Sequence, residues 1–173
     1  KNIYIQYNKN KDLFKHYFFD NLIHGILENE EEIKNSLNYF KVDIRSPYTI
    51  LSLEISDFKQ KIIDMDDEEK NLQICKVISS TEKILIEKNS FCKINSFNNI
   101  LIILGEISDL SEIIKIAEEI KEEINKKYNI MINIGIGRSY NQLKDIFVSF
   151  REARSALKYK YYMSENSIIP IDY

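Results

Sequence analysis

Residues 100–104, Ile-Leu-Ile-Ile-Leu, are apolar at every position, and this run constrains the fold more than the rest of the sequence does. It is rich in β-branched isoleucine, which favours a strand, and successive side chains of a strand point to opposite faces of a sheet. Both faces of this strand must therefore be shielded from water. We expect a central strand that is covered on both sides, or on one side by its own domain and on the other by a partner.

Further β-prone segments accompany this strand. Residues 91–96 precede it, and the Phe-Asn-Asn sequence at 97–99 separates the two runs. Asparagine tolerates the positive φ angles of tight turns, so the two runs are predicted to form a hairpin. Residues 48–56 and 131–137 alternate and are predicted as strands, while residues 167–171 are predicted as a short edge strand.

Helices are indicated by apolar residues that recur at steps of three and four. The predicted helices are residues 11–28, a short helix that Asn29 opens, a helix of about 20 residues after the acidic run 64–69, a helix headed by Asp109 and Glu112, and a last helix headed by Ser149 and Glu152. Strand, helix, two strands, helix and strand in this order form the ferredoxin-like split β-α-β arrangement, an α+β fold with helices on one face of an antiparallel sheet. We therefore predict an N-terminal helical segment, residues 1–44, followed by an α+β domain, residues 45–173.

Charge and composition limit the partners of the chain. A formal net charge of -3 and a pI near 5.6 exclude the strongly basic surface that phosphate neutralisation requires, so we expect the segment alone to bind DNA weakly. The sequence has no signal peptide and no apolar run long enough to span a bilayer, which favours a cytoplasmic protein without a membrane partner. Cys75 and Cys92 do not form a CxxC motif, and we expect both thiols to pack as small apolar core residues.

Neither the histidines nor the acidic run forms a metal site by its spacing. His16 and His24 are eight positions apart, so they are not the i, i+4 pair that grips a metal ion on a helix. The acidic run 64–68 begins like a calcium loop, but Glu69 stands where the turn glycine is needed and Cys75 where the bidentate glutamate belongs. We interpret the run as a solvated helix start and predict no metal site.

The sequence offers little for catalysis. Gly135-Ile-Gly137 resembles a phosphate-binding loop only in its glycines, because neither GxxxxGKS/T nor GxGxxG opening a helix is present. We expect these glycines to pack against a helix at the end of a strand. No nucleophile accompanied by a base and an orienting group is apparent. We therefore predict no catalytic residue and no cofactor.

Three stretches of the chain together resemble one known family. Residues 135–160, GIGRSYNQLKDIFVSFREARSALKYK, resemble the pattern GIGxxYxxLxxLxxSYxEAxxALxYK. Residues 19–27, FDNLIHGIL, resemble the helix LxxLLxGxl, and residues 48–58, YTILSLEISDF, resemble the first strand. These patterns are typical of GGDEF-like middle domains in AraC-type, YesN-like two-component response regulators, and the resemblance covers nearly the whole chain. The GGDEF-like domain of PucR and CdaR-type regulators shares the SYxEAxxAL feature, whereas the ending ALKYKYY favours the response-regulator branch.

The resemblance also implies where a nucleotide site would lie. Active diguanylate cyclases carry Gly-Gly-Asp-Glu-Phe on the hairpin between the second and third strands, and a carboxylate of the first strand joins it in holding Mg²⁺. The matching positions here are Asn98 and Asn99 on the hairpin and Glu54 and Ser56 on the first strand, so one candidate carboxylate is left. No RxxD sequence precedes the hairpin to form the family's inhibitory dinucleotide site. The resemblance therefore implies a degenerate nucleotide site without catalysis.

The function implied by the resemblance is that of a signal-relay or dimer-organising domain in a bacterial transcription regulator. Such a domain lies between an N-terminal receiver and a C-terminal helix-turn-helix pair, and only that pair contacts DNA. The chain starts without methionine and stops within a predicted extended stretch, so we expect it to be one segment of a longer protein. Two alternatives stay open: a domain that senses a small molecule or nucleotide, as in PucR and CdaR-type regulators, and a divergent nucleotide cyclase that uses Glu54 and the acids of residues 64–67.

The start of the chain favours self-association. Residues 3–27 contain more large apolar side chains than one helical face can bury against a single domain. The simplest partner is another copy of the chain in a two-fold homodimer. Phe14 and Phe18, one helical turn apart, are the predicted contacts, and packing of both rings within the domain is the alternative.

Overall fold

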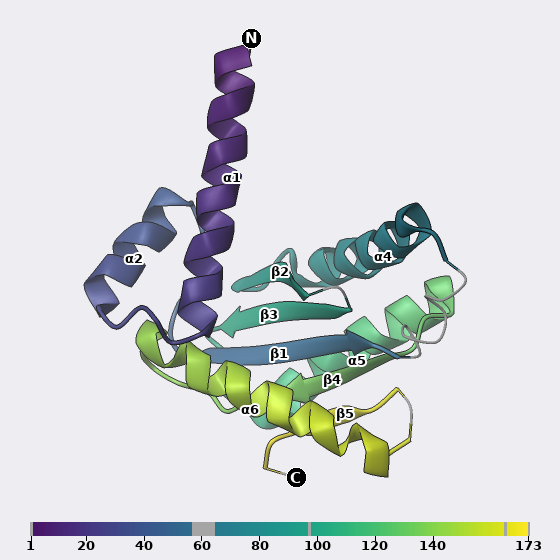
Figure 1. The fold of residues 1–173 in the computed structure, drawn as a ribbon. Helices are drawn as coiled ribbons and strands as arrows, with labels where there is room; N and C mark the ends of the chain where they lie inside the picture. The colour runs from purple at the N-terminus through teal and green to yellow at the C-terminus, as the bar shows by residue number, and fades with distance from the viewer. Residues whose placement is uncertain (1, 57–64, 97, 165, 173) are drawn as a thin grey trace.

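The computed structural model describes residues 2–56, 65–96, 98–164 and 166–172 (Figure 1). The elements in chain order are α1 (Asn2–Ile23), α2 (Glu30–Tyr39), β1 (Tyr48–Ile55), α4 (Asp67–Leu85), β2 (Ser90–Ser96), β3 (Asn99–Gly105), α5 (Leu110–Tyr128), β4 (Ile132–Ile136), η2 (Leu143–Asp145), α6 (Ile146–Lys158), η3 (Tyr159–Tyr162) and β5 (Ile168–Pro170). Within these ranges, five strands form one sheet in the order β2-β3-β1-β4-β5. The predicted α+β architecture with an N-terminal helix is confirmed.

Strand β3 lies inside the sheet, between β1 and β2, and is buried along its whole length. It pairs antiparallel with both neighbours, so that Ile103 faces Ile50 of β1 and Phe91 of β2. Strand β1 also pairs antiparallel with β4, whereas the short β5 joins β4 in parallel. The expected central strand is confirmed, because an apolar core lies on each of its faces.

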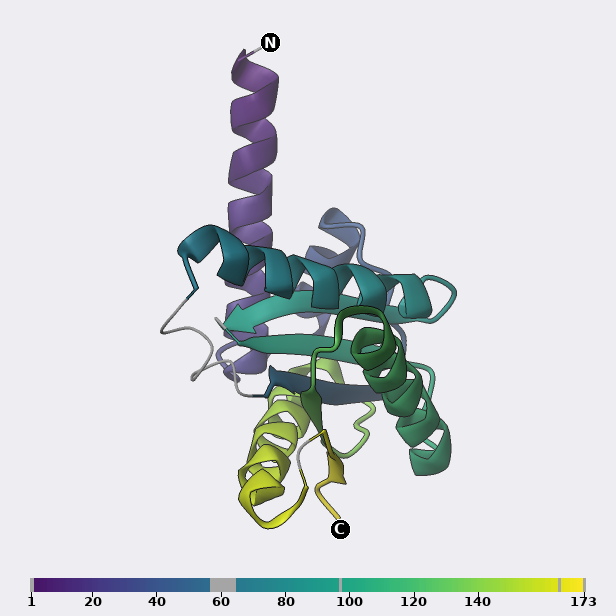
Figure 2. The same ribbon diagram turned by 90° about the vertical axis from the view of Figure 1, so that its right-hand side faces the viewer.

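Helices cover both faces of the sheet (Figures 1 and 2). Helices α4 and α5 pack on the face that carries Leu51 and Ile102. Helix α6, α2 and the C-terminal end of α1 pack on the opposite face, which carries Ile50, Leu101 and Ile103. The prediction that the two helices of the ferredoxin-like motif share one face is confirmed for α4 and α5, whereas α6 covers the second face, whose apolar side chains also need cover.

Helix α1 differs in its bounds from the helix predicted at 11–28. It starts well before residue 11 and ends ahead of Gly25, whose φ of 73° is a left-handed conformation. A Cβ atom on Gly25 would lie 2.9 Å from the Phe147 ring of α6. Glycine therefore both ends α1 and allows α6 to come close.

Capping side chains fix the starts of several helices. Asn29 caps α2 and Asp109 caps α5, each through a side-chain oxygen that accepts hydrogen bonds from backbone N–H groups of the first turn, as predicted. Ser149, which is predicted to begin the last helix, lies instead inside α6 and is fully buried. Its Oγ accepts a hydrogen bond of 2.9 Å from the Ile50 N–H of β1, so α6 supplies the partner that this buried strand amide needs.

Helix α6 rests directly on β4. A Cβ atom on Gly135 would lie 2.1 Å from the carbonyl oxygen of Ala153, and a Cβ atom on Gly137 would lie 2.1 Å from that of Ser149. Only residues without a Cβ atom permit so close an approach of the two backbones. The expectation that these glycines pack against a helix is therefore confirmed.

One expectation from composition fails, at Cys75. Cys75 is exposed on α4, because Ile74 and Val77 form the buried side of that helix and the thiol points elsewhere. The side chain of Cys92 lies outside the described residues. In the described ranges, no helix combines the length and the apolar character that crossing a membrane would require.

Candidate functional site

The residues at the four predicted nucleotide positions lie together where β1 ends and β3 begins. Glu54 faces Asn99 across the β1–β3 ladder, and the Ile55 N–H donates a hydrogen bond of 3.1 Å to the Asn98 carbonyl oxygen. Ser56 follows directly after β1. The structure thus gathers these positions, although the first strand and the hairpin are far apart in the sequence.

Asn99 is turned onto β1. Its side chain is almost fully buried, and its Nδ2 donates hydrogen bonds of 2.8 Å to the Ser52 hydroxyl and 3.0 Å to the Leu53 carbonyl oxygen. Both bonds run from the hairpin to the neighbouring strand. Asn99 therefore ties the hairpin to β1 at the position where the resemblance implies a metal-binding acid.

Asn133 of β4 completes the cluster from the other side of β1. It faces Glu54 across the β1–β4 ladder, and its Nδ2 donates a hydrogen bond of 2.8 Å to the Ser56 hydroxyl. Its Oδ1 accepts a hydrogen bond of 3.0 Å from the Ser167 N–H. Asn133 lies in the predicted strand 131–137, but the alternating pattern does not reveal its role, because the strand that pairs with it cannot be read from that pattern.

The cluster is rich in amides and hydroxyls rather than acids. Glu54 is flanked in the sheet by Asn99 on one side and Asn133 on the other. Within the described ranges, no group of three or more histidine, cysteine, aspartate or glutamate side chains lies close enough together to hold a metal ion. Magnesium in nucleotide-processing sites is usually held by carboxylates together with phosphates. The arrangement is suited to joining three strands by hydrogen bonds.

The acidic run before α4 acts as a helix start. Asp66 is the N-cap of α4, and its Oδ1 accepts a hydrogen bond of 2.8 Å from the Glu69 N–H. Asp67 is largely exposed and lies 3.4 Å from the Lys70 ammonium group. Asp64 lies outside the described residues. The described part of the run matches the interpretation of a solvated helix start.

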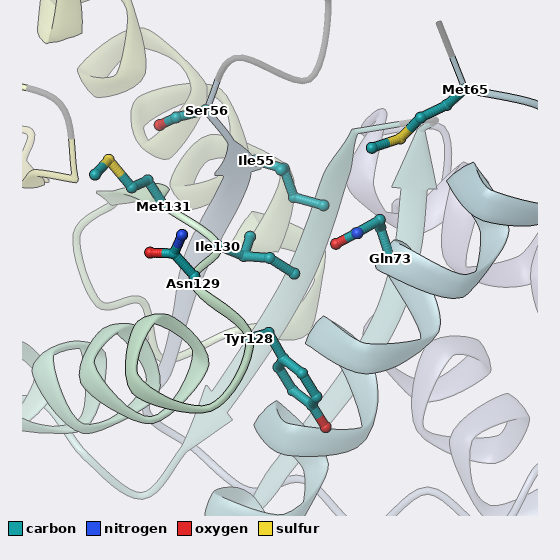
Figure 3. A pocket seen from close by; sticks show the side chains of 8 residues that line it. All are labelled: Ile55, Ser56, Met65, Gln73, Tyr128, Asn129, Ile130 and Met131. Atoms are coloured by element: carbon teal, nitrogen blue, oxygen red, sulfur yellow. The ribbon is translucent and has the colours of Figure 1, made fainter. Parts of the chain in front are cut away.

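A cavity of about 220 Å³ lies beside the cluster, between the end of β1, α4 and the connection from α5 to β4 (Figure 3). It is lined by Ile55, Ser56, Met65, Gln73, Tyr128, Asn129, Ile130 and Met131. Figure 3 shows Ile55, Gln73 and Ile130 pointing toward one another across it. Two ammonium groups approach the Tyr128 ring, that of Lys76 at 5.6 Å and that of Lys127 at 5.3 Å from its centroid. The cavity combines apolar side chains with the amide groups of Gln73 and Asn129 and the hydroxyl of Ser56.

The two predicted dimer contacts have different surroundings. Helix α1 extends away from the sheet toward its N-terminus (Figure 1), and Phe14 on this part is 62% exposed. The Phe18 ring packs instead against Phe19, at 5.0 Å between centroids, and against Phe40, at 5.5 Å. Phe18 therefore belongs largely to the packing of the domain, and Phe14 lies on its surface.

Two more exposed side chains accompany Phe14. Leu13 is 50% exposed and Tyr17 is 57% exposed. At about 100° per residue, the three side chains fall on one side of α1. Both residues belong to the apolar range 3–27, but periodicity alone does not select them, because it does not separate a buried side of this helix from an exposed one.

The chain matches one family by sequence. A family profile described as a GGDEF-like domain matches residues 24–159. No curated protein matches the sequence.

Solved structures share the fold at low sequence identity. The active GGEEF domain of a diguanylate cyclase from Vibrio cholerae is 16% identical, with a TM-score of 0.61, over 80% of this chain and 88% of that one. The GGDEF domain of DgcB from Caulobacter crescentus in complex with c-di-GMP is 14% identical, with a TM-score of 0.63, over 85% and 92% of the two chains. The coiled coil and GGDEF domain of the same protein, also with c-di-GMP, is 13% identical, with a TM-score of 0.59, over 98% and 97%. At these identities the likeness establishes the fold alone.

Proposed function

Because the chain belongs to the GGDEF-like domain family, we propose that it is a non-catalytic domain that relays a signal and dimerises within a larger bacterial transcription regulator. In this proposal, a receiver domain precedes it in a cytoplasmic two-component phosphorelay, and AraC-type helix-turn-helix domains follow it. The net charge of -3 supports assigning DNA binding to those other domains.

The observation that carries the non-catalytic part of the proposal is the surroundings of Glu54. Metal-assisted phosphoryl chemistry needs several oxygen ligands, usually carboxylates, that converge on the ion. The ladder neighbours of Glu54 are two asparagines, and the amide of Asn99 is already bonded to β1. These contacts support the proposal that the polar groups of the hairpin hold the strands together and do not bind a metal ion.

A cyclase assay tests this part. The purified chain, incubated with GTP or ATP and Mg²⁺, should form no cyclic nucleotide or cyclic dinucleotide above the background of a protein-free reaction. Product can be measured by liquid chromatography and mass spectrometry. Glu54→Ala is the matched control, and it should behave as the wild type does. Turnover that disappears in Glu54→Ala would establish the divergent-cyclase alternative instead.

The dimerisation part of the proposal is supported by α1. Leu13, Phe14 and Tyr17 leave an apolar strip on the part of α1 that extends from the domain. Burial of such a strip is favourable, and a second copy of the chain offers an identical strip across a two-fold axis. A structure that covers 98% of this chain is described as a coiled coil with a GGDEF domain. We therefore assign the homodimer contact to these three residues.

Ligand sensing is a second candidate function, favoured by the cavity beside Ser56. Its volume of about 220 Å³ suits a small ligand, and the Gln73 amide and the Ser56 hydroxyl offer groups to orient one. A PucR or CdaR-type regulator would use such a cavity to detect a small molecule or nucleotide. In this second candidate function, the GGDEF-like fold is retained, and the domain binds a ligand without catalysing a reaction.

Thermal denaturation with a panel of nucleotides and sugars separates the two functions. A ligand that binds only the folded state stabilises it by about 2.7 kcal/mol at one hundred times its Kd. The relay proposal predicts no shift of Tm with any member of the panel. A shift that is lost in Gln73→Ala, and retained in the exposed control Glu69→Ala, would favour sensing.

A further inference from the structure

The Glu30 carboxylate joins α2 to the turn that begins α6. Its Oε1 accepts a hydrogen bond of 2.8 Å from the Leu143 N–H, and its Oε2 accepts one of 3.0 Å from the Lys144 N–H. Gln142, which precedes this turn, provides no side-chain cap. The amides ahead of α6 are therefore capped by a charged residue from the N-terminal helical segment, and hydrogen bonds to a carboxylate are among the stronger ones.

The end of α1 also bears on α6. The His24 ring lies 6.1 Å from the Phe150 ring between centroids, in an edge-to-face arrangement. Gly25 lies against the ring of Phe147. Both N-terminal helices therefore meet the first half of α6.

A second carboxylate ties α6 to the C-terminal segment. Glu152 Oε1 accepts hydrogen bonds from Arg138 Nη1 at 2.7 Å and from the Tyr140 hydroxyl at 2.9 Å, while its Oε2 accepts one from the Arg138 N–H at 2.8 Å. The Arg138 guanidinium also pairs with Asp172, which follows β5. Hydrogen bonding to Glu152, and then to Asp172, raises the pKa of Arg138, which favours the ionised cluster.

Helix α6 is held to the sheet between these two carboxylate contacts. Ser149 is bonded to the Ile50 N–H, and the backbone of α6 approaches that of β4 closely at Gly135. A helix constrained in this way shifts as one body, because packed interiors deform little. The geometry points to α6 as the element that couples the N-terminal helices to strand β5, with Glu30 and Glu152 as its two coupling contacts. Only the purpose of this coupling rests on the relay proposal.

Residue-resolved amide hydrogen exchange on the 173-residue chain tests the coupling. Glu30→Gln keeps the size of the side chain and removes its charge. The Ile171 N–H, which donates to the Ile136 carbonyl oxygen at 2.9 Å, should then exchange about tenfold faster. Because Ile171 directly follows β5, a short edge strand, its amide exchanges by local opening, so a faster rate there reports on contacts that reach the end of β5.

Two comparisons separate coupling from a general loss of stability. Glu31→Gln changes the next residue of α2, which is exposed, and should leave the Ile171 rate at the wild-type value. Amides of β3 such as that of Ile102 exchange through global unfolding and should accelerate less than Ile171 does. The inference is overturned if Glu30→Gln accelerates exchange at Leu143 and Lys144 alone, or if Ile171 and Ile102 accelerate equally.

Coupling between two sites must act in both directions. Asp172→Asn should therefore accelerate exchange at the Leu143 and Lys144 amides, which Glu30 caps at the other end of the path. An effect of Asp172→Asn that stays within β5 would contradict the inference. These exchange rates do not depend on cyclase activity or on dimerisation. The coupling inference can therefore be overturned while the proposed function stands, and the proposed function can be overturned while the coupling stands.

Discussion

Gly135→Ala is expected to destabilise the domain by at least about 3 kcal/mol. The added Cβ atom would lie 2.1 Å from the Ala153 carbonyl oxygen and 2.9 Å from the Leu157 side chain, so α6 must lift from β4. Replacing glycine restricts the unfolded chain and gains only about 0.4–1 kcal/mol, which is too little to offset the clash. For a chain of this size the loss corresponds to a fall in Tm of about 6–12 °C, measurable by circular dichroism.

Met131→Val is the matched control for this substitution. Met131 immediately precedes β4 and its side chain is 41% exposed, so its replacement should change stability by no more than about 0.5 kcal/mol. A Gly135→Ala protein with the Tm of the wild type would mean that α6 does not rest on β4 through this glycine.

Phe14→Glu is expected to weaken self-association at least about 100-fold. The ring is 62% exposed and lies on the same side of α1 as Leu13 and Tyr17, which are also exposed. A two-fold contact contains each substitution twice, so two apolar rings are lost and two like charges are brought together. Analytical ultracentrifugation should show a monomer over the concentrations at which the wild type is a dimer, with an unchanged circular dichroism spectrum.

Two further variants distinguish the dimer contact from the domain core. Asn8→Glu places the same side chain at an exposed position on the opposite side of α1 and should leave the dimer intact. Phe18→Glu should lower Tm instead, because the Phe18 ring packs against Phe19 and Phe40. A Phe14→Glu protein that dimerises with the wild-type Kd would place the contact away from this strip.

The elements with strong periodicity are the part of the fold that the sequence predicts well. The run at 100–104 is apolar on both faces and does become a buried inner strand. Asp109 caps α5 as predicted, because an N-cap is a local interaction between residues close in the chain. The prediction that Gly135 and Gly137 pack against a helix is also correct. A glycine at a strand end is typical of a place where another backbone comes close, because it has no Cβ atom.

The contacts between distant segments are the part that the sequence does not predict. Ser149 has the spacing of a helix start with Glu152, but its hydroxyl is used by a strand amide that is 99 positions away. Asn133 gains its role from Ser56, which is 77 positions away. Glu30 fits the first turn of a helix by its charge, while its hydrogen bonds go to a different helix. In each case the residue fits the local sequence pattern, but its hydrogen-bond partner is a residue that is distant in the sequence and close only in the folded structure.

The hydrogen bonds of Asn99 also bear on how this domain can evolve. Its amide nitrogen lies 2.8 Å from the Ser52 hydroxyl and 3.0 Å from the Leu53 carbonyl oxygen. An aspartate here would present a carboxylate to that carbonyl oxygen, and neither group carries a proton to share. A carboxylate at position 99 therefore calls for a compensating change in β1. The effect of Asn99→Asp therefore depends on the residues of β1. The single substitution is expected to destabilise the sheet, so a protein that carries Asn99 is not expected to acquire an acid at this position in one step.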